Sequence, residues 1–231
     1  MAVDDRSCLN CTGEPCEHAT GDNPDYCLGG SVTPEIHEEV RRRYLDPEIH
    51  AIYEASVRSS ALCSNLTRVQ EIIEFARGLG VRKIGLASCT IMDAFSVEAS
   101  YAARTFARIL RDAGFETYGV ACKIESNHRS DLDIHVSEGS QDTILCNPIM
   151  QARLLEEAGT ELNVVVGLCV GHDALFYRHS AAVTTTLAGK DHITMNNPCA
   201  ALYGCNSIYK QRIQETVDAC RADLDSRPQS R

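Results

Sequence analysis

The chain has 231 residues, of which 44% are hydrophobic and 23% are charged, as in an ordinary globular protein with its own core. Its formal net charge of −10 argues against binding to nucleic acid, which normally needs a basic surface. No apolar run reaches the length of a membrane span, and the acidic N-terminus lacks the apolar segment of a signal peptide. We therefore expect a cytoplasmic protein that binds no membrane.

Residues 1–30 form the first predicted unit. They contain few aliphatic residues and cannot build a hydrophobic core. They do contain Cys8, Cys11, Cys16 and Cys27, and the first pair has the Cys-x2-Cys spacing with which one turn grips a metal ion. Zinc is the default ion for four thiolates, and an iron–sulfur cluster is the other option. The alternative is a flexible tail with reduced, unliganded thiols.

Helical signals begin next. We expect a helical connector over residues 31–60, with helices starting at Pro34 and Pro47, and then a helix over 66–76 capped by Ser64 or Asn65. From there strands and helices alternate. The expected strands cover 81–87, 115–121, 163–168 and 182–187, with a short apolar piece at 143–145, and the expected helices cover 94–113, 147–158 and a last segment from about 207.

This alternation predicts a three-layer, Rossmann-like α/β domain over residues 61–222 with a mostly parallel sheet, followed by a polar tail at 223–231. No GxGxxG or GxxxxGK[ST] motif follows a strand, so a nucleotide-binding site is not supported. In the last helix, Cys220 shares an apolar stripe with Ile213 and Val217, and we expect it in the core.

Four further cysteines, the central cysteines, mark the candidate site. Cys89, Cys122 and Cys169 each end a predicted strand, and Cys146 precedes the helix start Asn147-Pro148. Twelve cysteines in a cytoplasmic protein favour metal ligation or thiol chemistry over disulfides. Neighbouring parallel strands lie about 4.8 Å apart, which would bring thiols at their ends within reach of one metal or cluster. The alternative is that each is a small buried hydrophobe.

Three polar residues complete the candidate set. His172 could act as an acid or base or as a fifth ligand, although a histidine in a turn more often makes only hydrogen bonds. Asp173 would orient His172 or cap the next helix, and Lys123 stands beside Cys122. We take His172, Asp173 and Lys123 as the candidate catalytic residues.

With these motifs in view, the chain resembles the family called domain of unknown function 1847, whose members carry a metal-binding label because of four N-terminal cysteines. The resemblance implies metal binding at that first set and implies no activity. It rests on the four N-terminal cysteines, on 83–89, on 122–123, on 146–152, on 167–173 and on the stretch from Thr184 to Pro198.

Three functions remain open. The first is an iron–sulfur protein whose central cysteines hold a cluster for redox or cluster-assisted chemistry. The second is a thiol enzyme for sulfur transfer or thiol exchange, with a cysteine nucleophile and a structural zinc site. The third is a non-catalytic module that senses or carries metal. The expected partners are a small-molecule substrate or a redox protein, and a homo-oligomer is allowed.

Overall fold

The computed structural model describes residues 7–11, 16, 23–89, 101–134 and 142–226. The chain divides into two compact units, Met1–Val57 and Arg58–Arg231, and each is described by itself. The first part of the helix predicted over 94–113 lies outside the described residues. Over the described residues, no helix is long and apolar enough to cross a membrane.

Most elements begin and end where the sequence signals place them. Pro34, Pro47 and Pro148 each open a helix, as proline does at a first helical position. The helices are α2 (Pro34–Arg43), α3 (Pro47–Ser60), α4 (Arg68–Leu79), α5 (Tyr101–Asp112), α6 (Pro148–Glu157), α7 (His172–His179), α8 (Cys199–Tyr203) and α9 (Lys210–Ser226). The strands are β1 (Lys83–Ser88), β2 (Glu116–Ala121), β3 (Leu162–Leu168) and β4 (Val183–Gly189).

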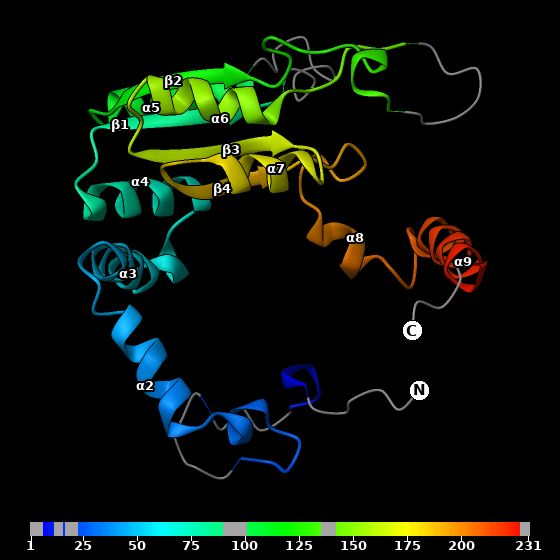
Figure 1. Ribbon diagram of the computed structural model, residues 1–231, viewed down its shortest axis with the longest axis horizontal. Coiled ribbons are helices and arrows are strands. Elements are labelled where there is room, and N and C mark those ends of the chain that lie inside the picture. The colour runs from blue at the N-terminus through cyan, green and yellow to red at the C-terminus, as the bar shows by residue number, and fades with distance from the viewer. Residues whose placement is uncertain (1–6, 12–15, 17–22, 90–100, 135–141, 227–231) are drawn as a thin grey trace. The chain divides into compact units, whose positions relative to one another are not determined.

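The four strands form one parallel sheet in the order β2-β1-β3-β4 (Figure 1). From β1 the chain moves to β2 on one side and then returns to β3 on the other. The topological switch point therefore lies between β1 and β3, and in open α/β sheets the crevice beyond this point is where ligands bind. The predicted α/β fold with a parallel sheet is confirmed.

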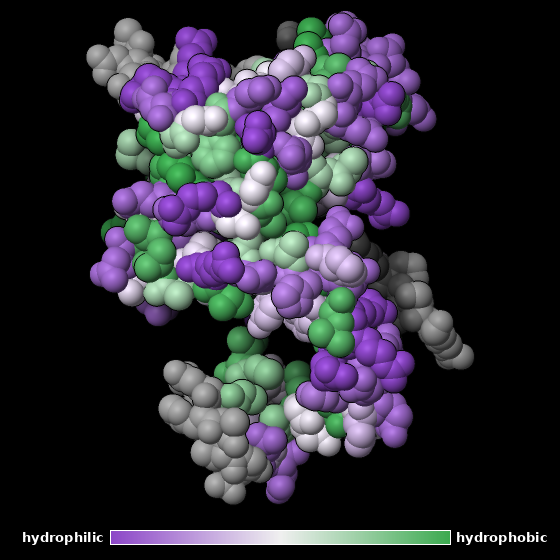
Figure 2. Space-filling model, turned by 90° about the vertical axis from the view of Figure 1, so that its left-hand side faces the viewer, coloured by the Kyte–Doolittle hydropathy of each residue, from purple (hydrophilic) through white to green (hydrophobic). Residues whose placement is uncertain are grey.

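Helices cover both faces of the sheet, as the two buried clusters show. On one face, α4 and α5 pack on β1 and β3 through residues such as Ile72, Leu110 and Val164. On the other face, α6 and α7 pack through Leu155 and Phe176. On the surface seen in Figure 2, hydrophilic side chains are interspersed with smaller hydrophobic groups, as on ordinary water-exposed protein surface.

Two contacts fix the sheet where its strands begin. The carboxylate of Glu161, just before β3, accepts hydrogen bonds from the backbone amides of Arg82 (2.8 Å) and Lys83 (2.9 Å). These amides hold the pKa of Glu161 below its ordinary value.

In the middle of β1, a Cβ at Gly85 would overlap the side-chain oxygen of Asn163 and crowd Leu155, so only glycine fits there.

The structure corrects several expectations. The cap of α4 is Thr67, which forms a capping box with Gln70, instead of Ser64 or Asn65. Cys220 is exposed, because no residue of α9 is buried. That helix also continues to Ser226, past the predicted start of the polar tail.

Candidate functional site

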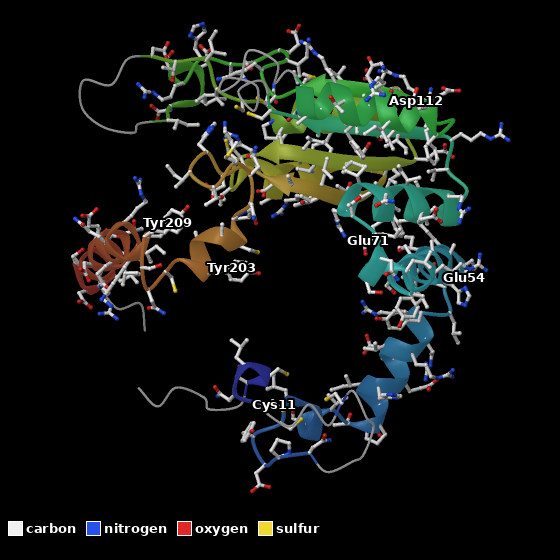
Figure 3. The ribbon with its side chains drawn as sticks, turned by 180° about the vertical axis from the view of Figure 1, so that it is seen from behind. Cys11, Glu54, Glu71, Asp112, Tyr203 and Tyr209 are labelled. Atoms are coloured by element: carbon white, nitrogen blue, oxygen red, sulfur yellow. The ribbon has the colours of Figure 1, made fainter. Side chains whose placement is uncertain are left out.

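Cys89 and Cys122 extend two neighbouring strands at the carboxyl edge of the sheet. The Cys89 amide donates to the carbonyl of Val166 on β3 (3.2 Å), and the Cys122 amide donates to the carbonyl of Ser88 on β1 (2.9 Å). Both side chains are buried in the cluster beneath α6 and α7. Figure 3 shows sulfur atoms at this end of the strands. The two thiols therefore point to the same face from adjacent strand ends.

Cys146 and Cys169 approach the same edge from two other segments. Cys146 is half-buried against the same cluster, and the amide of the next residue, Asn147, donates to the carbonyl of Cys122 (2.8 Å). Asn147 caps α6 by accepting from the Met150 amide (3.0 Å). Cys169 is half-buried directly after β3. Four segments distant in sequence thus bring the central cysteines to one edge.

Lys190 is the cation of this site, and our sequence reasoning missed it. It directly follows β4, and its amide donates to the carbonyl of Leu168 at the end of β3 (3.1 Å). Its half-buried side chain places Nζ 3.2 Å from Cys89 Sγ. A search for any reactive residue at a strand end, instead of cysteines alone, would have found Lys190.

The charges of Lys190 and its thiol neighbours are coupled. Burial alone would lower the pKa of the Lys190 ammonium. The hydrogen bond to Cys89 and the negative charge of Cys89 and Cys169 as thiolates outweigh burial, so the pKa of Lys190 is raised above 10.5. We call Cys89, Cys169 and Lys190 the thiol–lysine site. It flanks the switch point between β1 and β3.

Gln151 is a second residue that the sequence reasoning missed. Its side chain is completely buried on α6, at a position where the surrounding residues are apolar. Its Nε2 donates to the carbonyls of Ser88 (3.2 Å) and Val120 (2.7 Å), the last residue of β1 and the next-to-last of β2. Its Oε1 has no hydrogen-bond partner among the described residues. Gln151 therefore ties together the two strand ends that carry Cys89 and Cys122.

The structure gives local contacts for two of the three predicted catalytic residues, Asp173 and Lys123, and their catalytic role stays a prediction. Asp173 Oδ1 accepts from the amides of Gly171 (3.0 Å) and Ala174 (2.7 Å), so it stabilises the first turn of α7 as the capping alternative predicted. Within the described chain, no hydrogen bond joins Asp173 to the half-buried side chain of His172. Lys123 Nζ bonds the backbone carbonyl of Ile144 instead of a thiol.

Two of the N-terminal cysteines, Cys8 and Cys11, lie at one short turn of the first unit. Cys8 opens a 3-10 turn, and the Cys11 amide donates to the Cys8 carbonyl (3.2 Å). This turn is joined to the segment of Cys27 by Tyr26, whose hydroxyl donates to a carbonyl of the turn (3.2 Å). Cys11 is labelled in Figure 3. The Cys-x2-Cys turn and the neighbourhood of Cys27 are therefore in contact, while Cys16 is exposed.

Neither cysteine set forms a complete metal site in the arrangement described. Across residues 7–11, 16, 23–89, 101–134 and 142–226, no three His, Cys, Asp or Glu side chains gather closely enough to hold one metal ion. At the central edge, the Lys190 ammonium would also repel a cation bound beside Cys89. Among the described residues the central thiols are not gathered around one ion, and both metal predictions stay predictions.

Comparison with known proteins decides the family. The model of the family described as protein of unknown function (DUF1847) matches residues 28–187, more than half of the chain. The chain belongs to the DUF1847 family. An uncharacterized protein of Methanocaldococcus jannaschii is 35% identical over 183 residues, which are 78% of this chain and 91% of that protein. No solved structure matches the chain.

The DUF1847 match covers part of the two candidate sites. It begins after Cys27, so the four N-terminal cysteines lie outside it, whereas all four central cysteines lie inside it. It ends at residue 187, just before Lys190. The family description states no activity, so the chemistry has to be argued from the residues of this DUF1847 protein.

Proposed function

We propose that this DUF1847 protein is a thiol enzyme, in which the thiolate of Cys89 attacks an electrophilic sulfur of a small substrate. The observation that carries the proposal is the 3.2 Å contact between Lys190 Nζ and Cys89 Sγ at the switch point of the sheet. A thiolate, not a thiol, is the sulfur nucleophile, and a neighbouring ammonium stabilises it.

The surroundings of Cys89 support a small substrate. Cys89 is only 4% exposed, whereas Lys190 and Cys169 are half-buried beside it. A substrate would approach Cys89 from the side of Lys190 and Cys169. The ammonium of Lys190 would then lie next to the leaving sulfur, where negative charge develops during the displacement. Sulfur transfer and thiol exchange both begin with this step.

A central iron–sulfur cluster is the second candidate. It is favoured by the approach of four thiols, from four segments, to one edge of the sheet. The N-terminal cysteines are a separate proposal, a structural zinc or cluster site, and the contact between the turn of Cys8 and the segment of Cys27 supports it. The fit of the central edge is better for thiol chemistry because of Lys190.

Anaerobic purification followed by metal and sulfide analysis separates these candidates. The thiol enzyme predicts no iron and no sulfide at the central cysteines, so any metal or sulfide in the wild type belongs to the N-terminal cysteines and is retained in Cys89→Ser. A brown protein with iron and sulfide that are lost in Cys89→Ser would support the cluster and overturn the proposal. Reversible metal uptake at the central cysteines without any fast-reacting thiol would instead indicate a metal-carrying module.

A further inference from the structure

Cys122 lies beside Cys89, where a second thiol could attack a mixed disulfide formed on Cys89 and release the bound substrate; such a thiol is called a resolving thiol. The parallel register pairs Ser88 with Ala121, so the next pair along the two strands is Cys89 and Cys122. The hydrogen bond from the Cys122 amide to the Ser88 carbonyl continues this pairing beyond the strand ends. Both side chains enter the same buried cluster. The two thiols are therefore neighbours on one face of the sheet.

The spacing suits a disulfide between Cys89 and Cys122. Paired residues on neighbouring strands lie about 4.8 Å apart, and disulfides usually join Cα atoms about 4.4–6.8 Å apart. Cys169 is less suitable, because Ser88 pairs with Val166 and Cys169 therefore stands two residues beyond the partner of Cys89.

The strand order also suits the direction of attack. Displacement at a sulfur atom is in-line, so the attacking and leaving sulfurs lie on opposite sides of the central one. Cys89 ends β1, Cys122 lies on its β2 side, and Lys190 and Cys169 lie on its other side. A leaving group near Lys190 is therefore opposite Cys122.

Gln151 fixes the spacing of the two thiols. Its buried amide donates to carbonyls at the ends of both β1 and β2, directly beneath Cys89 and Cys122. An apolar residue could fill this buried position on α6 without leaving an unpaired Oε1. The amide bridge instead restrains how far the two strand ends can separate.

We infer that Cys89 and Cys122 form a reversible disulfide, which makes the site a two-electron thiol–disulfide centre for small disulfides; this rests on the proposed function. The Cys89 thiolate attacks the substrate disulfide, forms a mixed disulfide and releases one substrate thiolate, which takes up a proton. Cys122 then loses its proton, attacks Cys89 Sγ and releases the second substrate thiolate. Counted from the Cys89 thiolate, the protein loses two electrons and the proton of Cys122; with one further proton from solvent, the substrate disulfide becomes two thiols.

Oxidation of the full-length protein by oxidised glutathione, followed by non-reducing peptide mapping, tests this inference. We expect the wild type to give a Cys89–Cys122 linkage and Cys122→Ser to accumulate glutathione on Cys89, with an adduct lifetime at least about tenfold longer. The matched control is Cys146→Ser, which removes a thiol from the same cluster and should leave the linkage intact. Gln151→Met should lengthen the lifetime of the adduct without slowing its formation.

The outcomes separate this inference from the proposed function. In one outcome, Cys89 of the wild type acquires glutathione rapidly, but the adduct then persists or Cys89 forms a disulfide with Cys169. In that case Cys122 is not the resolving thiol, and only the inference fails. If Cys89 acquires glutathione no faster than Cys122 or Cys146, Cys89 is not the nucleophile and the proposed function itself fails.

Discussion

Removing the Lys190 ammonium should slow the reaction of Cys89 with a small alkylating reagent at neutral pH. Lys190→Met keeps the length of the side chain and deletes the charge 3.2 Å from Cys89 Sγ. Loss of an opposite charge at this range reduces the thiolate fraction roughly 10- to 100-fold, and the half-burial of Lys190 favours the lower part of that range.

The net effect on the rate is smaller than the loss of thiolate. A more basic thiolate is a better nucleophile, with a Brønsted slope of about 0.4–0.5, which recovers roughly 3- to 10-fold of the rate. We therefore expect Lys190→Met to alkylate roughly 3- to 10-fold more slowly at neutral pH. At alkaline pH, where the thiol is ionised in both proteins, the variant should react faster than the wild type.

This reversal with pH separates loss of charge from loss of structure. The assay is a pH–rate profile of Cys89 labelling, read by mass spectrometry of its peptide. Lys123→Met is the matched control, because it removes the same charge at the same edge from a side chain that contacts a backbone carbonyl. An unchanged Cys89 rate in Lys190→Met, or an equal loss in Lys123→Met, would refute the reasoning. The pKa of Lys190 is raised above 10.5, so the stability that its charged side chain contributes is present below pH 10.5 and is lost as pH rises through the folded value.

Three further predictions concern stability and the first unit. Gly85→Ala should lower the free energy of unfolding by roughly 1–3 kcal/mol, because the added methyl group overpacks against Asn163. Gly119→Ala on β2, where the methyl group meets open space, should lower it much less; urea unfolding measures both. The pKa of Glu161 is lowered, so the stability that its carboxylate contributes is present above pH 4.5 and is lost as pH falls through the pKa of the folded protein. Glu161→Gln should therefore show a smaller acid-induced drop in the urea midpoint of unfolding. Chelation, or Cys11→Ser, should release metal and increase proteolysis in the first unit only, and unchanged metal content would count against a site there.

The fold could be predicted because a few strong signals agree. The strand around Val165 is buried on both faces, and its run of β-branched residues is typical of a parallel sheet. Proline at the first position set the starts of α2, α3 and α6. The start of α4 was misplaced because Ser64 and Asn65 were preferred over the Thr67–Gln70 capping box, which is the more specific signal.

The site was less accessible to sequence reasoning than the fold. The rule that strand ends meet at one edge located Cys89 and Cys122. The partner of Cys89 is Lys190, which is 101 residues away in the sequence. The two meet because β4 pairs with β3, and the amide of Lys190, directly after β4, bonds the end of β3 beside β1. Spacing along the sequence carries no information about such a contact. Gln151 was missed for the same reason, since its two acceptors lie on separate strands.

The most direct test of the central claim is a site-resolved map of thiol reactivity in the anaerobically purified wild type. Brief labelling with a small alkylating reagent at neutral pH, followed by mass spectrometry of every cysteine peptide, ranks the central cysteines by rate. A thiolate held by Lys190 predicts that Cys89 labels fastest among them, despite being only 4% exposed. A rate for Cys89 as low as that of buried Cys122 would contradict the account.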